Sequence, residues 1–363
     1  MALQIAVENS NIDIVYSILG YPNSEITQNA FQQCKKLTFF SIPSSVVSIG
    51  YSSFKECLSL TQIKIPSSVK SIGPYAFFRC SSLIEINIPS SVISIGKNAF
   101  DGCKSLEHIS IPSSLSVLED CIFGNCLSLK HIVIPPTITS IGKYVFDNCK
   151  SLSQINIPLS VTAIDNDAFH YCESLKQIII PESVTSIGEG ILKGCSSLTE
   201  ISIPSTMSIF DMFFFFGCKS LTEIIIPSFI KEINEYCFGL CTSLEKITFN
   251  SCITSLKKAV FYKCKSLKYI SIPSSVIEIG EGAFYECNSL KQISIPSSVK
   301  SIGEYAFFAC TSLKNVLFEN PSQLTSIGNH AFDKCSSMDH LDIPSTVTYI
   351  GEDAFPQSNC SIF

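Results

Sequence analysis

The hydrophobic positions of this chain recur every 23 residues over most of its length. In the clearest copy, residues 57–80, the segment 60–65 ends in a strict alternation of apolar and polar side chains. Ile63 is expected to point inward, with Gln62 and Lys64 outward, as in a short strand with one solvated face. Because one such unit cannot bury its apolar face alone, the period predicts a solenoid whose successive coils stack on one another.

The rest of the repeat predicts a second extended segment and a compact turn. Pro66 ends the strand by removing a backbone donor, and residues 69–72 resume an extended pattern. This pattern closes at Gly73, where we expect the backbone to bend sharply. Residues 74–80 carry apolar side chains three and four positions apart, which predicts a short helix or 3₁₀ turn.

The repeated phrase IPSSVxSIGxxAFxxCxSLxxI resembles the leucine-rich repeats of BspA-like proteins and recurs nearly verbatim from Ser41 to Gly351. The resemblance implies a right-handed leucine-rich-repeat horseshoe of about 14 coils, with parallel β-strands on the concave face and short helical or 3₁₀ turns elsewhere. It also implies a recognition protein without catalytic residues, often found at the cell surfaces of microbes and protists.

The pattern divides the chain into three segments. We expect a helical N-terminal segment at residues 1–24, the solenoid at 25–358 and a frayed tail at 359–363. The first segment resembles the helix–turn–helix of a single ankyrin repeat, and is either a cap on the first coil or the stub of an ankyrin array. No linker interrupts the 23-residue period, so the solenoid is expected to form one domain.

The C-terminal residues Cys360-Ser-Ile-Phe fit the pattern of a prenylation site. The preceding stretch contains neither basic residues nor a second cysteine for acylation, and one lipid alone anchors a protein only marginally. The competing explanation is a chance match in a cysteine-rich chain. Prenylation of Cys360 would make the protein a peripheral membrane protein.

Thirteen of the 18 cysteines occupy the same slot of the repeat. Stacked coils would bring them within disulfide range, but their parallel Cα–Cβ directions disfavour bridging, so we expect a ladder of buried thiols. A disulfide or metal ladder is the alternative, although no Cys-x-x-Cys is present. The thirteen are Cys34, Cys57, Cys80, Cys103, Cys126, Cys149, Cys172, Cys195, Cys218, Cys241, Cys264, Cys287 and Cys310.

Composition narrows the location and the class of partner. The first residues lack the basic and apolar regions of a signal peptide, and no apolar run approaches the ~18 residues of a membrane helix. The lack of these two features and the expected reduced thiols favour a cytoplasmic protein. The family resemblance gives the cell surface as the alternative. The net charge is −6 and the basic residues are scattered, which argues against a nucleic-acid partner.

Outward-facing strand positions form columns that hold candidate binding residues. Glu85, His108 and His131 would lie about 5 Å apart and could in principle hold a metal. No fourth ligand or supporting residue is visible, so solvated side chains are the favoured interpretation, and we assign no metal or cofactor. A second column contains the apolar residues Val133, Ile179 and Ile225, and the column of Glu85 also contains Tyr269. These apolar and aromatic residues form either a partner site or a crowded patch.

The most unusual coil lies at residues 209–218, where four phenylalanines follow one another. Core packing accounts for Phe215 in the usual Phe slot, but Phe213 and Phe216 occupy positions that are polar or small in most other coils, with aromatic exceptions such as Tyr75 and Phe78. These two rings either anchor a partner or repack locally.

Motifs of enzyme chemistry are lacking, since the chain has no phosphate-binding glycine loop and no nucleophile elbow. We therefore predict a non-catalytic scaffold that binds a protein or peptide through the concave solenoid face and the aromatic patch. The alternative is a cell-surface adhesin or antigen of the BspA-like kind.

Overall fold

The computed structural model describes residues 20, 22–338, 340–356 and 361–362. In these residues the chain is a parallel-strand β-solenoid of about 14 turns, which confirms the predicted leucine-rich-repeat architecture. The solenoid divides into two compact units, unit 1 (Met1–Ile191 with Ile201–Pro204) and unit 2 (Leu192–Glu200 with Ser205–Phe363). Nearly all of the ankyrin-like segment 1–24, and the proposed prenylation site Cys360, lie outside the described residues.

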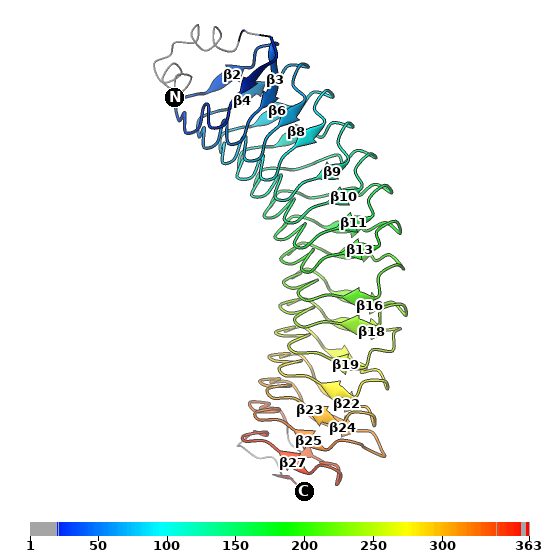
Figure 1. Ribbon diagram of the computed structural model, residues 1–363. Coiled ribbons are helices and arrows are strands. Elements are labelled where there is room, and N and C mark those ends of the chain that lie inside the picture. Colours follow the sequence, from blue (N-terminus) through cyan, green and yellow to red (C-terminus); the bar gives the residue numbers. More distant parts are fainter. Residues whose placement is uncertain (1–19, 21, 339, 357–360, 363) are drawn as a thin grey trace. The chain divides into compact units, whose positions relative to one another are not determined.

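The turns of unit 1 contribute parallel strands to two faces (Figure 1). The first face carries β2 (Phe39–Ser41), β4 (Gln62–Lys64), β6 (Glu85–Asn87) and β8 (His108–Ser110), isolated bridges at Val133 and Asn156, then β12 (Gln177–Ile179) and β14 (Glu200–Ser202). The second face carries β1 (Ser24–Ile26), β3 (Val46–Ile49), β5 (Ser71–Ile72), β7 (Ser94–Ile95), β9 (Val117–Leu118), β10 (Ser140–Ile141), β11 (Ala163–Ile164) and β13 (Ser186–Ile187).

Unit 2 repeats the same two faces. Its first face carries β16 (Glu223–Ile226), β18 (Lys246–Phe249), β20 (Tyr269–Ile270), β22 (Gln292–Ile295), β24 (Asn315–Phe318), β26 (His340–Leu341) and β28 (Ser361–Ile362). Its second face carries β15 (Ile209–Phe210), β17 (Glu232–Ile233), β19 (Ser255–Leu256), β21 (Glu278–Ile279), β23 (Ser301–Ile302), β25 (Ser326–Ile327) and β27 (Tyr349–Ile350).

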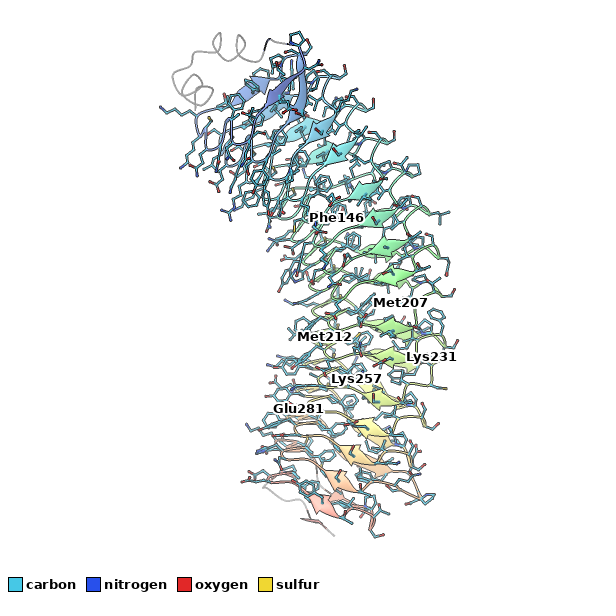
Figure 2. All side chains as sticks on the ribbon, in the orientation of Figure 1. Phe146, Met207, Met212, Lys231, Lys257 and Glu281 are labelled. Atoms are coloured by element: carbon cyan, nitrogen blue, oxygen red, sulfur yellow. The ribbon has the colours of Figure 1, made fainter. Side chains whose placement is uncertain are left out.

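The core of each unit is a stack of identical residues from successive coils. Phe54 and Phe77 stack at 5.3 Å between ring centroids with an interplanar angle of 10°. Phe146, labelled in Figure 2, stacks on Phe169 at 5.6 Å. The stacks form because a 23-residue period places the same side chain above itself in each coil, at the strand spacing of about 4.8 Å. Ile63 is buried between exposed Gln62 and Lys64, which confirms the predicted alternation.

The repeat cysteines form a second ladder beside the phenylalanines, and no cysteine that the structure describes takes part in a disulfide. The Cys80 thiol donates a hydrogen bond to the carbonyl oxygen of Phe54 in the preceding coil, at 3.0 Å. Cys335 makes the same contact to Phe307 at 3.1 Å, so the ladder continues past the last regularly spaced cysteine. Burial raises the pKa of the Cys80 thiol, which keeps it protonated and able to donate.

The predicted short helix or 3₁₀ turn is wrong for the described residues, because the segments after each glycine are irregular turns. Tyr75 and Arg79 have φ values of 57° and 56°, which interrupt any run of right-handed residues. The amide of Ala76 bonds within the turn to Gly73 at 3.3 Å, whereas the amide of Tyr75 bonds to Lys97 of the next coil at 3.0 Å. Apolar spacing of three and four fitted a helix, but pairing between coils determines the backbone.

The repeat glycine allows successive coils to pack closely. A Cβ atom on Gly73 would lie 2.8 Å from the carbonyl carbon of Gly50 in the preceding coil, far inside contact distance. Gly96 shows the same restriction, with Pro74 nitrogen only 2.5 Å from its would-be Cβ. Glycine is therefore required at position 73 by the close approach of two backbones.

Candidate functional site

The first face of unit 1 presents a regular grid of outward side chains. Parallel pairing aligns Gln62 with Glu85 and Glu85 with His108, so they form one column across β4, β6 and β8. Pairing of Lys64 with Asn87 and of Asn87 with Ser110 forms the adjacent column, which bridges onward to Val133. A groove of about 750 Å³ runs over these columns from Gln62 to Val133.

Polar contacts tie neighbouring residues of this grid together. The side-chain amide of Gln62 donates to Glu85 Oε1 at 3.4 Å, and Gln154 Nε2 lies 3.3 Å from His131 Nδ1. At the rim, Lys130 forms an ion pair with Glu107 of the preceding coil at 2.8 Å. Among the residues that the structure describes, no three His, Cys, Asp or Glu side chains are grouped so that they could hold a metal ion.

The apolar members of the grid are open to solvent. Val133 is 78% exposed and Ile179 is 55% exposed, on a face where Asn156 fills the intervening position. Neighbouring side chains therefore do not cover these two residues. They are therefore exposed apolar side chains on the first face of unit 1.

The first face of unit 2 carries a similar set. Ile225 is 59% exposed, and Tyr269, which pairs with Lys246 in the adjacent strand, is 56% exposed. Leu317, 60% exposed on β24, was not singled out from the sequence, although it lies in the same slot of the repeat as Ile225. Aligning the repeats by slot would have found it.

Phe213 and Phe216 are half-buried rather than exposed. The Phe213 ring stacks on Tyr236 at 5.3 Å, and Lys193 Nζ lies 4.8 Å from its centroid. The Phe216 ring meets Phe213 edge-on at 5.3 Å. Local packing thus covers part of each ring and leaves the remainder at the surface.

These two rings begin a longer row of half-buried aromatic side chains on the turns of unit 2, which we call the outer aromatic row. Tyr262 stacks on Tyr285 at 5.1 Å, and Tyr285 stacks on Phe308 at 4.9 Å. Lys263 Nζ lies 5.1 Å from the Tyr262 ring centroid. Sequence analysis missed the row because its members are divided between two slots of the repeat. Its members are Phe213, Phe216, Tyr236, Tyr262, Tyr285, Phe308 and Tyr305.

A second hollow lies on the second face of unit 2, with a volume of about 360 Å³. Lys231 and Lys257, both labelled in Figure 2, line it. Lys257 pairs with Glu232 and also donates to Asn234 Oδ1 at 2.9 Å, so its charge is neutralised within the chain. One of the two lysine charges that line this hollow is therefore already neutralised.

The family model for the BspA type leucine rich repeat region matches residues 24–153, 139–268 and 254–362, in overlapping segments that span nearly all of the solenoid. The chain belongs to the BspA-type leucine-rich repeat proteins. Proteins of this repeat family are generally non-enzymatic scaffolds. No curated protein matches the chain.

Solved structures of bacterial leucine-rich repeat proteins agree with this assignment. A leucine-rich repeat protein from Bacteroides ovatus is 30% identical, with a TM-score of 0.64 over 90% of this chain and 87% of that one. A leucine rich cell surface protein from Faecalibacterium prausnitzii is 31% identical, with a TM-score of 0.56 over 83% and 84%. The pneumococcal vaccine antigen PcpA, 17% identical with a TM-score of 0.51 over 93% and 92%, shares the fold.

Proposed function

We propose that this BspA-type protein is a non-catalytic scaffold that binds a protein or peptide partner through the first face of its solenoid. The observation that carries the proposal is Val133, 78% exposed at the edge of a groove of about 750 Å³. Exposed apolar residues beside hydrogen-bonding side chains are the usual composition of a recognition surface. The outer aromatic row is a second candidate surface, since its rings are only half-buried.

The setting of this binding is proposed to be the cell surface, as an adhesin or antigen. The 31% identical Faecalibacterium protein, described as a leucine rich cell surface protein, supports this alternative over the cytoplasmic location expected from the thiols and the first residues. No helix that could span a membrane occurs in the part of the chain that the structure describes. Prenylation of Cys360 stays a separate prediction.

Partner capture from cells of the source organism tests the binding face. Val133→Asn with Ile179→Asn places at both positions the residue that Asn156 already provides between them, so folding should be preserved. We expect this double variant to lose the proteins that the wild-type chain captures. A matched control, Ile93→Asn with Leu159→Asn, removes side chains that are 66% and 79% exposed elsewhere on unit 1 and should keep those proteins.

A third variant, Phe213→Ser with Phe216→Ser, tests the outer aromatic row. Loss of capture in this variant alone would move the binding site from the first face to the aromatic row. Retention of every captured protein by all variants would contradict the proposed function. Labelling of intact cells with a membrane-impermeant reagent, using an N-terminal tag that leaves Cys360 free, tests the location.

A further inference from the structure

Three lysines form a column beside the first face of unit 2. Lys268, Lys291 and Lys314 each directly precede a strand, namely β20, β22 and β24, and follow one another at the 23-residue period. The amide of Lys314 bonds to the carbonyl of Lys291 at 2.9 Å, which places these two residues side by side in adjacent coils. Both side chains are exposed.

The same column contains an internal example of how such a lysine is neutralised. Lys268 forms an ion pair at 2.7 Å with Glu245, which holds the same slot one coil earlier. In unit 1, Lys130 pairs in the same way with Glu107, its predecessor in the slot, at 2.8 Å. A lysine at this rim is therefore neutralised when the preceding coil supplies a carboxylate.

Lys291 and Lys314 lack this arrangement, because their predecessors in the slot are Lys268 and Lys291. No ion pair joins either residue to a carboxylate within the described part of the chain. Like charges directly opposite each other on neighbouring strands are destabilising. Among the described residues, Lys291 and Lys314 therefore carry positive charge without a carboxylate partner, and an anionic ligand would stabilise this charge.

The surroundings of the lysines indicate the class of this ligand. Tyr269, 56% exposed, lies at the start of β20, and Leu317, 60% exposed, lies on β24. Nucleic acid or an anionic glycan would find only a short basic column here, in a chain of net charge −6. A peptide that carries both carboxylates and apolar side chains would use the lysines together with the two exposed apolar residues.

We infer that the first face of unit 2, from Lys268 to Leu317, binds an extended acidic peptide segment with interspersed apolar residues. The inference rests on the proposed peptide-binding function and specifies its partner. Carboxylates of the segment contact Lys291 and Lys314, and its apolar side chains contact Tyr269 and Leu317. The charge contacts make binding weaken as salt is added.

A direct binding measurement tests the inference with defined peptides. The probe is a fluorescent peptide of repeated Glu-Pro-Leu triplets, and its counterpart has Gln in place of Glu. In an extended polyproline II conformation each triplet advances about 9.3 Å, or about two coil spacings of ~4.8 Å, so one Glu carboxylate can lie between Lys291 and Lys314 and contact both. We expect the acidic peptide to bind at least about tenfold more tightly than the neutral one at low salt.

Charge-reversed variants locate the site. Lys291→Glu with Lys314→Glu should weaken binding of the acidic peptide by at least about tenfold. The matched control, Lys231→Glu with Lys300→Glu, makes the same charge change on the second face and should leave the affinity unchanged. Equal loss in both double variants would overturn the inference, because it would show a response to net charge rather than a site.

Other outcomes separate this inference from the proposed function. Equal binding of the acidic and neutral peptides would overturn the inference while the proposed peptide binding stands. A heparin fragment or a single-stranded oligonucleotide that binds more tightly than the acidic peptide, with the same dependence on Lys291 and Lys314, would overturn the peptide assignment. If neither peptide binds while capture still depends on Val133 and Ile179, the inference alone fails.

Discussion

The Cys80 thiol donates a hydrogen bond across 3.0 Å to the carbonyl oxygen of Phe54 in the preceding coil. The same carbonyl also accepts the amide of Cys57 within its own turn at 3.1 Å. Each repeat cysteine with this contact therefore fills a core position and also donates to the backbone of its neighbour. This relationship determines how the thiols respond to pH and to alkylating reagents.

Alkaline pH should destabilise the protein. Burial raises the pKa of the Cys241 thiol to about 12, while an unfolded thiol titrates near 8.5. Above about pH 8.5 the unfolded chain binds fewer protons than the folded one, so the free energy of unfolding falls as pH rises toward 12. Below pH 8.5 the full stability is retained.

Each such thiol should contribute a slope of up to about 1.4 kcal/mol per pH unit in this window. Urea unfolding at a series of pH values, with reductant present, measures the slope. Cys241→Ala should make it shallower by one thiol, whereas Leu159→Ala, at a 79% exposed site that holds no thiol, should leave it unchanged. A stability that stays constant from pH 8.5 to 11 would contradict the prediction.

Alkylation should distinguish the cysteines by burial. Cys252 is exposed, whereas Cys80, Cys149 and Cys287 are fully buried with raised thiol pKa values. In native protein, iodoacetamide should modify Cys252 first and leave the other three unmodified until the chain unfolds. Peptide mass spectrometry of the native and denatured reactions measures this order, and disulfides between successive coils would refute the free-thiol ladder.

Removal of one stacked ring should have a local effect. Phe146 is fully buried between Phe123 at 5.8 Å and Phe169 at 5.6 Å, so Phe146→Ala should reduce the free energy of unfolding by about 3–5 kcal/mol. Hydrogen exchange should rise in the adjacent coils, since a solenoid is stabilised by nearest neighbours. Leu159→Ala, at a 79% exposed site, is the control. A uniform rise across all coils would argue against local stability.

Two glycines of unit 2 should differ in their tolerance of alanine. A Cβ on Gly303 would lie 2.6 Å from the Glu281 nitrogen, so Gly303→Ala must push two coils apart and should cost about 3 kcal/mol. Gly217 has a φ of 76°, and a Cβ there would meet its nearest atom at an ordinary contact distance of 3.6 Å. Gly217→Ala should therefore cost only the backbone strain, about 1 kcal/mol. Equal losses of stability in thermal unfolding would show that close backbone approach does not explain why Gly303 is a glycine.

The lysine column predicts a variant that gains stability as it loses binding. Lys291→Glu places a carboxylate between Lys268 and Lys314, which replaces repulsion with attraction across neighbouring coils. The free energy of unfolding should rise by roughly 0.5 kcal/mol at low salt, and the gain should shrink as salt is added. Lys300→Glu, on the second face, is the control. A loss of stability in Lys291→Glu would contradict the repulsion.

The sequence alone determined the solenoid, its two faces and its buried ladders. A 23-residue period forces the same side chain to recur at the same place in each coil, so Ile63, Phe77 and Cys80 could be assigned to the core without coordinates. Strict alternation likewise assigned Gln62 and Lys64 to the surface. The exposed positions of Val133, Ile179, Ile225 and Tyr269 followed from the same rule.

Only the tertiary structure decided the features that depend on contacts between coils. The turn at Tyr75 was expected to be helical, because apolar spacing reports which side chains are buried but not where the backbone amides bond. The role of Gly73 depends on the backbone of Gly50, which lies 23 residues earlier in the sequence. The local pattern of apolar and polar residues indicates which side chains are buried. Contacts between stacked coils determine which backbone groups bond to each other, where a Cβ atom would clash and which charged side chains meet.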